Sequence, residues 1–356
     1  MRLIRFESIG AFIPEKKVST DELMSQLVCP QPIDLIEITG IRERRMLQSK
    51  ESSFTAARDA ALDCLKHSKY QPKDIEVIIS CSISRTLKLN PDSENIQFFF
   101  DPPLSHFIKN EVGMHSAINF DVSNACAGMM TGVHLLKHMI EAGVVKNGMV
   151  VSGEQISDIA ITATKEIQHP WDSQFGSLTI GDSGVAVIVD DEGIETDKID
   201  YLELVTCAEY ADLCIGKPSE KTPSYALYTN NAQMHKKERL LMWPAFQNAF
   251  FEKTGKTFKA EKFDYIIHHQ VGLKFVDMVN KLAESFFGTS MPPAINCLEE
   301  LGNTASTSHF ITLYKFLQKN KPASPIKILM VPAASGLITG MLSTTISNLK
   351  VSPCEQ

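Results

Sequence analysis

The sequence predicts an α/β fold built from two similar halves, and three observations support this prediction. Apolar, β-branched runs recur along the 356 residues, and each lies next to a segment with helical periodicity. Such alternation favours sheet strands covered by helices. The second half repeats the order of segments found in the first, which indicates an internal duplication. The composition, 44% hydrophobic and 22% charged, is typical of a globular protein.

The individual elements follow from periodicity and flanking residues. In the first half we expect helices and buried strands at these positions: helices at Ser53–His67 and Gly128–Ala142, and strands at Glu76–Ser80, Ala117–Val122, Gly148–Ser152 and Gly184–Val189. Residues 84–112 are polar and proline-rich before the aromatic run Phe98–Phe100, and we expect a loop excursion there, over a pocket mouth or at a dimer contact. Residues 208–232 are expected to be an irregular insertion.

The duplication rests on two echoes. Lys73–Ile79 resembles Lys262–His268, and Ala117–Phe120 (AINF) resembles Ala294–Cys297 (AINC). After each AIN segment a turn of small residues opens a helix, at Cys126 in the first half and at Asn303 in the second. Equivalent helix starts can meet at a pseudo-twofold axis, so the duplication would bring Cys126 and Asn303 together.

Composition also excludes several classes of function. A formal net charge of −7 argues against nucleic acid as the main partner, because phosphate binding relies on excess Lys and Arg. The eight cysteines form no CxxC pair and no zinc spacing with histidine, so we expect reduced thiols and no metal. Residues 1–16 do not resemble a signal peptide, and no stretch approaches the roughly 20 apolar residues of a membrane span. We expect a soluble, cytoplasmic protein.

Among the cysteines, Cys126 lies in a sequence pattern that is typical of a nucleophile. A strand ends near Val122, small residues make a tight turn, and an amphipathic helix begins close to Cys126. Unpaired backbone N–H groups and the helix dipole at that position would stabilise thiolate over thiol, as a cysteine nucleophile requires. The alternative is a small buried residue, as most cysteines are. The residues alone leave both interpretations open.

Ser123–Gly128 (SNACAG) resembles the nucleophile motif of β-ketoacyl-acyl-carrier-protein synthase III, a condensing enzyme of the thiolase superfamily. Further similar segments follow in the family's order: Ile13-Pro14, Thr39–Arg44 (TGIRER), Gly181–Gly184 (GDSG), His268–Gln270 (HHQ), Gly302–Thr304 (GNT) and Ser335–Leu337 (SGL). The resemblance covers about residues 8–345. It implies a thiolase-like, duplicated αβαβα layered fold with two pseudo-equivalent halves, residues 1–190 with the cysteine and 191–356 with a histidine and an asparagine.

The resemblance also implies roles for residues. Cys126 is the nucleophile, His269 the catalytic histidine and Asn303 an amide donor, while the backbone N–H groups of Cys126 and Gly336 form the oxyanion hole. His268 stands at the family's proline position and is the alternative histidine. Lys274 and Lys281 match basic positions that contact the acidic acyl carrier protein, although solvated surface lysines are the alternative. No metal or redox cofactor is implied.

The sequence departs from the family pattern in two respects. Asp34 and Ile38 stand where housekeeping members have the tryptophan and arginine that hold the coenzyme A adenine, which favours a carrier-protein-bound acyl donor. Asp101 stands where the family has a phenylalanine that gates the partner's acyl pocket. Head-to-head condensing enzymes place a glutamate there, so Asp101 is a tentative base, and an ordinary turn residue before Pro102-Pro103 is the alternative.

The function implied is acyl transfer to Cys126, followed by decarboxylative Claisen condensation with a malonyl or related acyl thioester in a homodimer. This chemistry belongs to fatty acid biosynthesis, and the longer 84–100 segment suits a pocket reshaped for specialised metabolism. Three alternatives stay open: transfer of the acyl group to an alcohol or amine, head-to-head acyl condensation using Asp101, and a non-catalytic partner subunit of a heterodimer.

Overall fold

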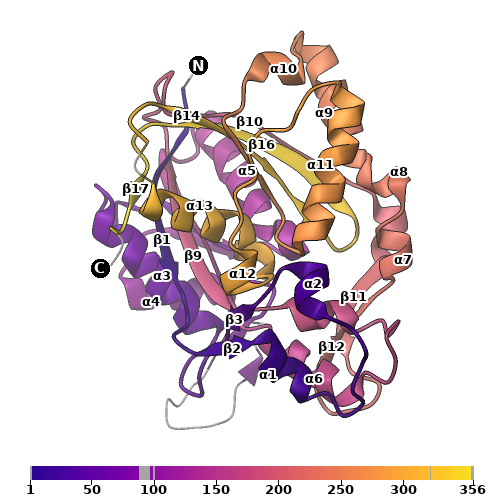
Figure 1. Ribbon diagram of the computed structural model, residues 1–356. Helices are drawn as coiled ribbons and strands as arrows, with labels where there is room; N and C mark the ends of the chain where they lie inside the picture. The colour runs from indigo at the N-terminus through magenta and orange to yellow at the C-terminus, as the bar shows by residue number, and fades with distance from the viewer. Residues whose placement is uncertain (1, 88–96, 99–100, 321, 354–356) are drawn as a thin grey trace.

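The computed structural model describes residues 2–87, 97–98, 101–320 and 322–353, and they form five layers in the order α-β-α-β-α (Figure 1). This confirms the predicted thiolase-like layered α/β fold. The first sheet has the strand order β17 (Lys350–Val351), β1 (Arg5–Phe12), β9 (Ser183–Asp190), β8 (Asn147–Glu154), β4 (Val77–Ser80) and β7 (Ile118–Asp121).

The second sheet repeats this arrangement. Its strand order is β10 (Lys198–Thr206), β16 (Ile338–Ile346), β14 (Ile326–Val331) and β13 (Tyr265–His268), and the short β15 (Ala333–Ala334) pairs with β16. β10 corresponds to β1 in order, and each has a register irregularity near its start, at Phe6/Ser8 in β1 and at Ile199/Tyr201 in β10. β17, from the end of the chain, joins the first sheet beside β1.

Two helices form the middle layer between the sheets, namely α5 (Gly128–Glu141) and α13 (Ser308–Lys319) (Figure 1). The outer face of the first sheet is covered by α3 (Ser53–His67) and α4 (Leu104–Val112), and that of the second by α9 (Met242–Thr254) and α11 (Leu273–Phe287). Successive side chains of a strand point to opposite faces. In β8, Val150 accordingly packs on the middle layer, whereas Met149 and Val151 pack on the outer helices.

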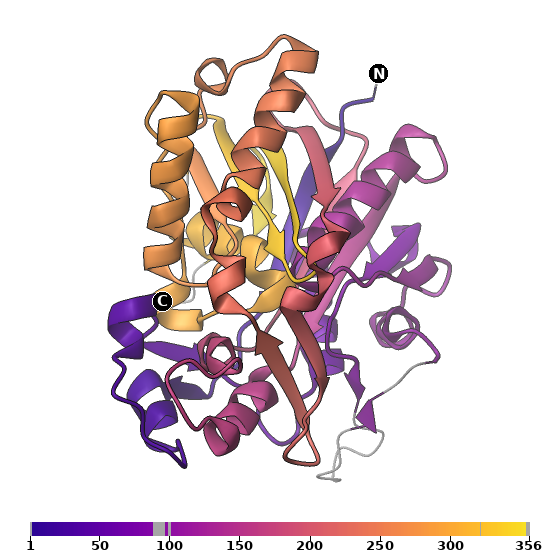
Figure 2. The same ribbon diagram turned by 90° about the vertical axis from the view of Figure 1, so that its right-hand side faces the viewer.

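The predicted elements of the first half lie where the sequence pattern put them, with bounds shifted by one or two residues. The segment 208–232 was predicted wrongly as irregular. It forms the 3₁₀ helix η4 (Ala208–Leu213), the hairpin β11 (Cys214–Pro218) and β12 (Tyr225–Thr229), and the start of α7 (Asn231–Met234). The hairpin extends away from the two sheets (Figure 2), so its strands lack the buried runs that mark a core strand.

The predicted loop over residues 84–112 is partly wrong as well. Its last third is α4, whose apolar face packs on the first sheet, and β5 (Thr86–Leu87) pairs with β6 (Gln97–Phe98). Residues 88–96, Phe99 and Phe100 lie outside the described part of the chain, so the expectation for their pocket or dimer contact stays a prediction.

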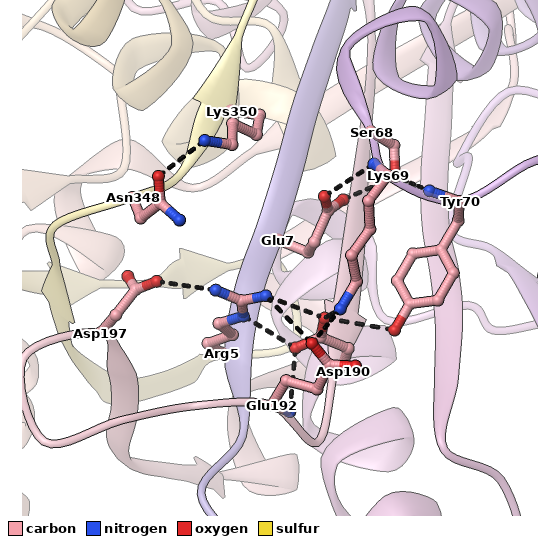
Figure 3. Close-up of polar contacts among 10 residues, drawn as sticks. All are labelled: Arg5, Glu7, Ser68, Lys69, Tyr70, Asp190, Glu192, Asp197, Asn348 and Lys350. Carbon is pink, nitrogen blue, oxygen red and sulfur yellow. Dashed lines mark hydrogen bonds and ion pairs between the residues drawn. The ribbon is translucent and has the colours of Figure 1, made fainter.

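An ion-pair cluster ties the start of β1 to the strand ends around it (Figure 3). Arg5 donates from Nε to Asp190 at 2.9 Å and from Nη1 to Asp197 at 3.3 Å. Lys69, just after α3, pairs with Asp190 at 3.1 Å. Because Asp190 ends β9 and Asp197 precedes β10, the cluster fixes the crossing from the first sheet to the second, on the edge of the molecule remote from Cys126.

Candidate active site

Cys126 lies in a tight turn between β7 and α5. The 3₁₀ helix η2 (Ala125–Ala127) connects the two elements, and Ala125 adopts a left-handed backbone conformation with φ 47°. α5 then starts at Gly128, where an added Cβ would lie 2.7 Å from the carbonyl oxygen of Cys81. Glycine therefore lets this turn lie directly against the chain that leaves β4.

The second half contains the matching turn. The 3₁₀ helix η5 (Ala305–Thr307) precedes α13, and Ala305 has φ 50°. η2 and η5 pack against each other at the middle of the molecule. By this match Ser306, not Asn303, is the structural counterpart of Cys126, which corrects the equivalence drawn from the AIN echo. The short helix α12 (Leu298–Leu301) lengthens the connection in the second half. Counting the same number of residues from each AIN segment therefore does not reach equivalent positions.

A cavity of about 610 Å³ brings the three predicted side chains together, because Cys126, His269 and Asn303 all line it. They come from three separate connections: the turn before α5, the residue after β13, and the segment before η5. The expectation that one thiol, one imidazole and one carboxamide share a site agrees with this geometry. Cys126 is half-buried, and the cavity gives access to the site.

His269 is held by α13. Its Nδ1 lies 2.8 Å from the Ser308 hydroxyl, and its ring stacks at 5.8 Å on that of His309. The side chain is only 5% exposed. Burial, together with neighbouring His309, lowers the pKa of His269 to about 3. The imidazole is therefore neutral at physiological pH and its remaining nitrogen, Nε2, is the one available to a ligand.

Asn303 is oriented by its own turn. Its Oδ1 accepts a hydrogen bond from the N–H of Ala305 at 3.0 Å, and its backbone pairs with Thr179 and Gly181 at 2.9 and 3.0 Å. Because the side-chain oxygen is used inside the turn, the Nδ2 amide is the group that Asn303 can offer to a ligand. The predicted role of Asn303 as a hydrogen-bond donor to a ligand stays a prediction.

The environment of the Cys126 sulfur overturns one expectation. Burial, with smaller contributions from Cys214 and Glu154, raises the pKa of the Cys126 thiol to about 12. The walls around it are apolar and include Ile156, Ile180 and Leu227. The resting group is thus the protonated thiol, whereas the position before a helix had led us to expect a stabilised thiolate.

The loop after β15 faces Cys126. Ala334 packs against Cys126, and Ser335 and Leu337 line the cavity. Between them Gly336 has φ 77°, followed by φ 48° at Leu337, so the backbone turns sharply at the position predicted to supply an oxyanion N–H. Ser335 Oγ also donates to Cys214 Sγ at 3.2 Å, which anchors this loop to β11.

The alternative histidine lies in the cavity wall as well. His268 Nε2 lies 2.7 Å from Asn280 Oδ1, and its ring meets Trp243 edge-on at 5.3 Å. Burial lowers the pKa of His268 to about 4. Both imidazole rings are therefore neutral. Nε2 of His268 is engaged by Asn280 of α11, whereas Nε2 of His269 has no hydrogen-bond partner among the described residues.

The remaining predicted residues lie at the mouth of the cavity or outside it. Lys274 lines the mouth and pairs with Glu37 at 2.9 Å, and Lys281 is exposed farther along the same helix. Ile38 lines the cavity, and Asp34 caps the helix α2 (Leu35–Thr39) by accepting from the N–H of Glu37. Asp101 is exposed and does not line the cavity of the single chain.

Sequence reasoning missed Arg239, which lines the cavity from α8 (Lys237–Leu240). Its Nη1 donates to the Gln233 carbonyl at 2.7 Å, its guanidinium lies 4.4 Å from the Tyr210 ring centre, and Nε is buried without a partner among the described residues. None of the described residues lining the cavity is Asp or Glu, although the chain is acidic. No local motif marks Arg239, because only the folded hairpin and α8 bring it to the wall.

No group of His, Cys, Asp and Glu in residues 2–87, 97–98, 101–320 and 322–353 is arranged to hold a metal ion. Within the same ranges, every helix is too short or too polar to cross a membrane.

The comparisons with known proteins agree with the fold. The family model for 3-oxoacyl-[acyl-carrier-protein (ACP)] synthase III matches residues 120–208. The β-ketoacyl-[acyl-carrier-protein] synthase III of Clostridium novyi (strain NT) is 24% identical over 352 residues, which cover 95% of this chain and 97% of that protein. The 3-oxoacyl-[acyl-carrier-protein] synthase III of Aquifex aeolicus VF5 superposes with a TM-score of 0.76 at 18% identity, covering 96% and 99% of the two chains. A variant of Xanthomonas campestris OleA with bound lauric acid and lauroyl-CoA superposes with a TM-score of 0.77 at 18% identity, covering 96% and 98%.

Proposed function

We propose that this chain, a condensing acyltransferase of the thiolase superfamily similar to 3-oxoacyl-(acyl-carrier-protein) synthase III, carries an acyl group on Cys126 and extends it by decarboxylative Claisen condensation. The observation that carries the proposal is the shared cavity of Cys126, His269 and Asn303. A thiol, a neutral imidazole and an amide donor are the groups needed for a thioester intermediate and an enolate.

In the first half-reaction, the Cys126 sulfur attacks the carbonyl carbon of an acyl thioester. Because the resting group is a thiol, its proton leaves with the departing sulfur, which is released as a free thiol. The N–H groups of Cys126 and Gly336 hold the tetrahedral oxyanion, and losing one such donor typically costs on the order of 3 kcal/mol of transition-state stabilisation.

In the second half-reaction, a malonyl-type thioester loses CO₂, and the electrons of the broken C–C bond form an enolate. Nδ1 of His269 lies 2.8 Å from the Ser308 hydroxyl, and in the tautomer that accepts this hydroxyl hydrogen the ring carries Nε2–H. That Nε2–H donates to the enolate oxygen together with Nδ2 of Asn303. The enolate carbon attacks the acyl carbonyl. The Cys126 sulfur then leaves and takes up a proton, which restores the thiol.

The cavity mouth fits an anionic thioester arm. Arg239 and Lys274 provide positive charge in a lining without carboxylates, and Lys274 is already paired with Glu37. A phosphate on the arm of the substrate would meet Arg239, whose charge has no carboxylate partner within the described residues. This supports coenzyme A or carrier-protein thioesters as substrates. The lauroyl-CoA bound by the similar OleA favours a long acyl chain.

We also propose a cytoplasmic homodimer that receives substrate from an acyl carrier protein, with Lys281 and Lys274 on α11 as contacts for the carrier. Asp101 is exposed in the single chain, so a catalytic role for it requires a partner subunit. Head-to-head condensation with Asp101 as base is the second candidate function. It predicts that condensation between two long acyl thioesters proceeds in wild type and stops in Asp101→Asn.

The test uses the intact protein with lauroyl-CoA and malonyl-CoA. Intact-mass spectrometry after lauroyl-CoA alone should show one lauroyl adduct, absent in Cys126→Ser. Adding malonyl-CoA should release CO₂ and give a 3-oxoacyl thioester, and His269→Ala and Asn303→Ala should keep the adduct but lose that product. A Lys281→Gln variant should behave as wild type with these coenzyme A substrates, because no carrier protein is present. Transfer of the lauroyl group to an added alcohol or amine without CO₂ release would contradict the condensation. Absence of any adduct would overturn the proposed function.

A further inference from the structure

Glu154 is a fully buried carboxylate at the end of β8, in the interior of the first sheet. Its carboxylate accepts hydrogen bonds from five groups: the N–H of Ile83 at 3.0 Å, the N–H and hydroxyl of Ser84 at 3.1 and 2.9 Å, the hydroxyl of Ser152 at 3.2 Å, and the hydroxyl of Ser306 in a short contact. The mechanism above does not use it.

These five donors are all neutral, and no Lys, Arg or His of the described residues contacts the carboxylate. Removing a carboxylate from water is costly unless its hydrogen bonds are made in full. Burial raises the pKa of Glu154, and the hydrogen bonds oppose that rise. An apolar side chain would fill the site at less cost, so the network points to a task other than packing.

The network joins the two halves of the molecule. Ile83 and Ser84 follow β4 in the first half, whereas Ser306 belongs to η5 in the second half. The hydroxyl oxygens of Ser152 and Ser306 also lie 2.7 Å apart, and because each hydroxyl has one hydrogen, Ser152 shares its hydrogen between Ser306 and Glu154. The side chain of Ser306 is therefore clamped from two sides by β8, at the position that corresponds to Cys126 in the first half.

Ser306 is adjacent to the residue that orients the Asn303 side chain. It follows Ala305, whose strained backbone (φ 50°) directs its N–H onto Oδ1 of Asn303. Its Cβ also lies 3.6 Å from the point where a side chain at Gly128 would begin, so the same residue packs on the start of α5. A shift of Ser306 would move the group that orients the Asn303 amide.

We propose that Glu154 is a positioning residue, which acts through Ser306 to fix the turn from which Asn303 donates to the enolate. The inference rests on the proposed function and assigns the effect to its second half-reaction. Acylation of Cys126 needs the thiol and two backbone N–H groups, so it depends less on this turn. Misplacement of a catalytic group by about 1 Å can cost on the order of a hundredfold in rate.

The test compares Ser306→Ala with Ser183→Ala. Ser306→Ala removes the link to η5 and leaves Glu154 four donors. Ser183 is an equally buried serine whose hydroxyl bonds Thr307 of the same turn at 2.7 Å, so Ser183→Ala is a matched control for losing a hydroxyl contact between the halves. Each protein is first acylated with lauroyl-CoA, the rate is measured by mass spectrometry, and the acyl-enzyme is then mixed with malonyl-CoA.

We expect the acylation rate of Ser306→Ala to lie within about twofold of the wild-type rate. Its condensation rate should be lower than that of wild type by about tenfold or more. Ser183→Ala should match wild type in both steps. Glu154→Gln provides a second variant, in which N–H groups of the new amide point at donors that bonded the carboxylate. If it folds, it should lose condensation as Ser306→Ala does, and only its condensation step is compared, because the Glu154 charge also acts on the Cys126 thiol. The inference is overturned if Ser306→Ala and Ser183→Ala slow condensation equally, or if Ser306→Ala slows acylation as much as condensation. Either result leaves the proposed function intact. If wild type forms no adduct, both fall.

Discussion

At Cys126 two effects act on the thiol in opposite directions. A helix N-terminus favours the thiolate by about 0.3–1 kcal/mol, which is less than one pKa unit, since one unit corresponds to about 1.4 kcal/mol. Burial raises the pKa from 9.0 to about 12, a much larger change. Desolvation therefore wins, and the sequence pattern, which contains the helix start but not the apolar walls, predicted the wrong direction.

This difference can be measured by alkylation of Cys126 with iodoacetamide at several pH values. Because the reactive thiolate is a small fraction of a thiol with a pKa of about 12, we expect the rate to rise about tenfold per pH unit from 7 to 9. Peptide mass spectrometry identifies the residue, and Cys126→Ser shows the background from the other cysteines. A rate already at its plateau at pH 7 would show that the helix start dominates.

Arg239 and Ile38 line the same cavity. Asp34 and Ile38 stand where an aromatic and a basic side chain were expected to hold the coenzyme A adenine, and the structure has Ile38 in the cavity wall. Arg239 approaches the same cavity from α8, and its Nε is buried without a partner among the described residues. Its guanidinium lines the cavity without a carboxylate partner among the described residues, and such a charge is suited to a phosphate.

We expect wild type to prefer lauroyl-phosphopantetheine to lauroyl-pantetheine in kcat/KM for Cys126 acylation by about tenfold, and Arg239→Gln to lose that preference. The variant should react with lauroyl-pantetheine as wild type does. Arg2→Gln removes an exposed arginine that pairs with Asp191 away from the cavity, and it should keep the preference. If Arg239→Gln also keeps it, the phosphate does not bind Arg239.

At the scale of elements, the site depends on two matching connections, η2–α5 and η5–α13. Each begins with an alanine in a left-handed conformation, and each places its helix in the middle layer. The repeat of AIN predicted that two such connections exist. Their alignment was three residues off, because α12 has no counterpart before η2. The order of elements can be read from a repeat, whereas residue equivalence needs the backbone path.

The hairpin β11–β12 illustrates the opposite case. Its sequence has no buried alternation, since each face carries an exposed apolar side chain, Ile215 on one and Tyr225 on the other, and it was expected to be irregular. The structure gives it two tasks at the cavity. Leu227 packs against the same apolar cluster as Cys126, and Cys214 anchors the loop of Ser335. Contacts of this kind depend on the tertiary fold and leave no periodic trace.

For the whole molecule, buried histidines link stability to pH. Burial lowers the pKa of His309 to about 4, as it does for His268, and that of His269 to about 3. Their ordinary value is 6.5, so between these values the unfolded chain binds more protons than the folded one. The free energy of unfolding therefore falls as the pH falls below 6.5.

His309 is a buried histidine that the proposed mechanism does not use. Its Nε2 bonds the Val331 carbonyl at 3.0 Å. Because its pKa falls from 6.5 to about 4 on folding, His309 lowers the free energy of unfolding by roughly 3 kcal/mol as the pH falls from 6.5 to 4. In urea unfolding at pH 7.5, His309→Gln should have a lower free energy of unfolding than wild type, because it loses the contact with the Val331 carbonyl. Between pH 7 and 5, the free energy of unfolding of His309→Gln should fall less than that of wild type. Parallel pH curves for the two proteins would show that His309 does not titrate in this range.

The sequence by itself determined the layered α/β class, the duplication and most core elements of the first half, and it singled out Cys126, His269 and Asn303, which line one cavity. Periodicity, small-residue turns and motif order are local properties that a single chain displays. Only the tertiary structure decided which groups surround those residues: the apolar walls that raise the Cys126 pKa, the clamp of Glu154 on Ser306, and the approach of Arg239 to the cavity. Desolvation and hydrogen bonding act between residues distant in sequence, and the path of the backbone brings them into contact.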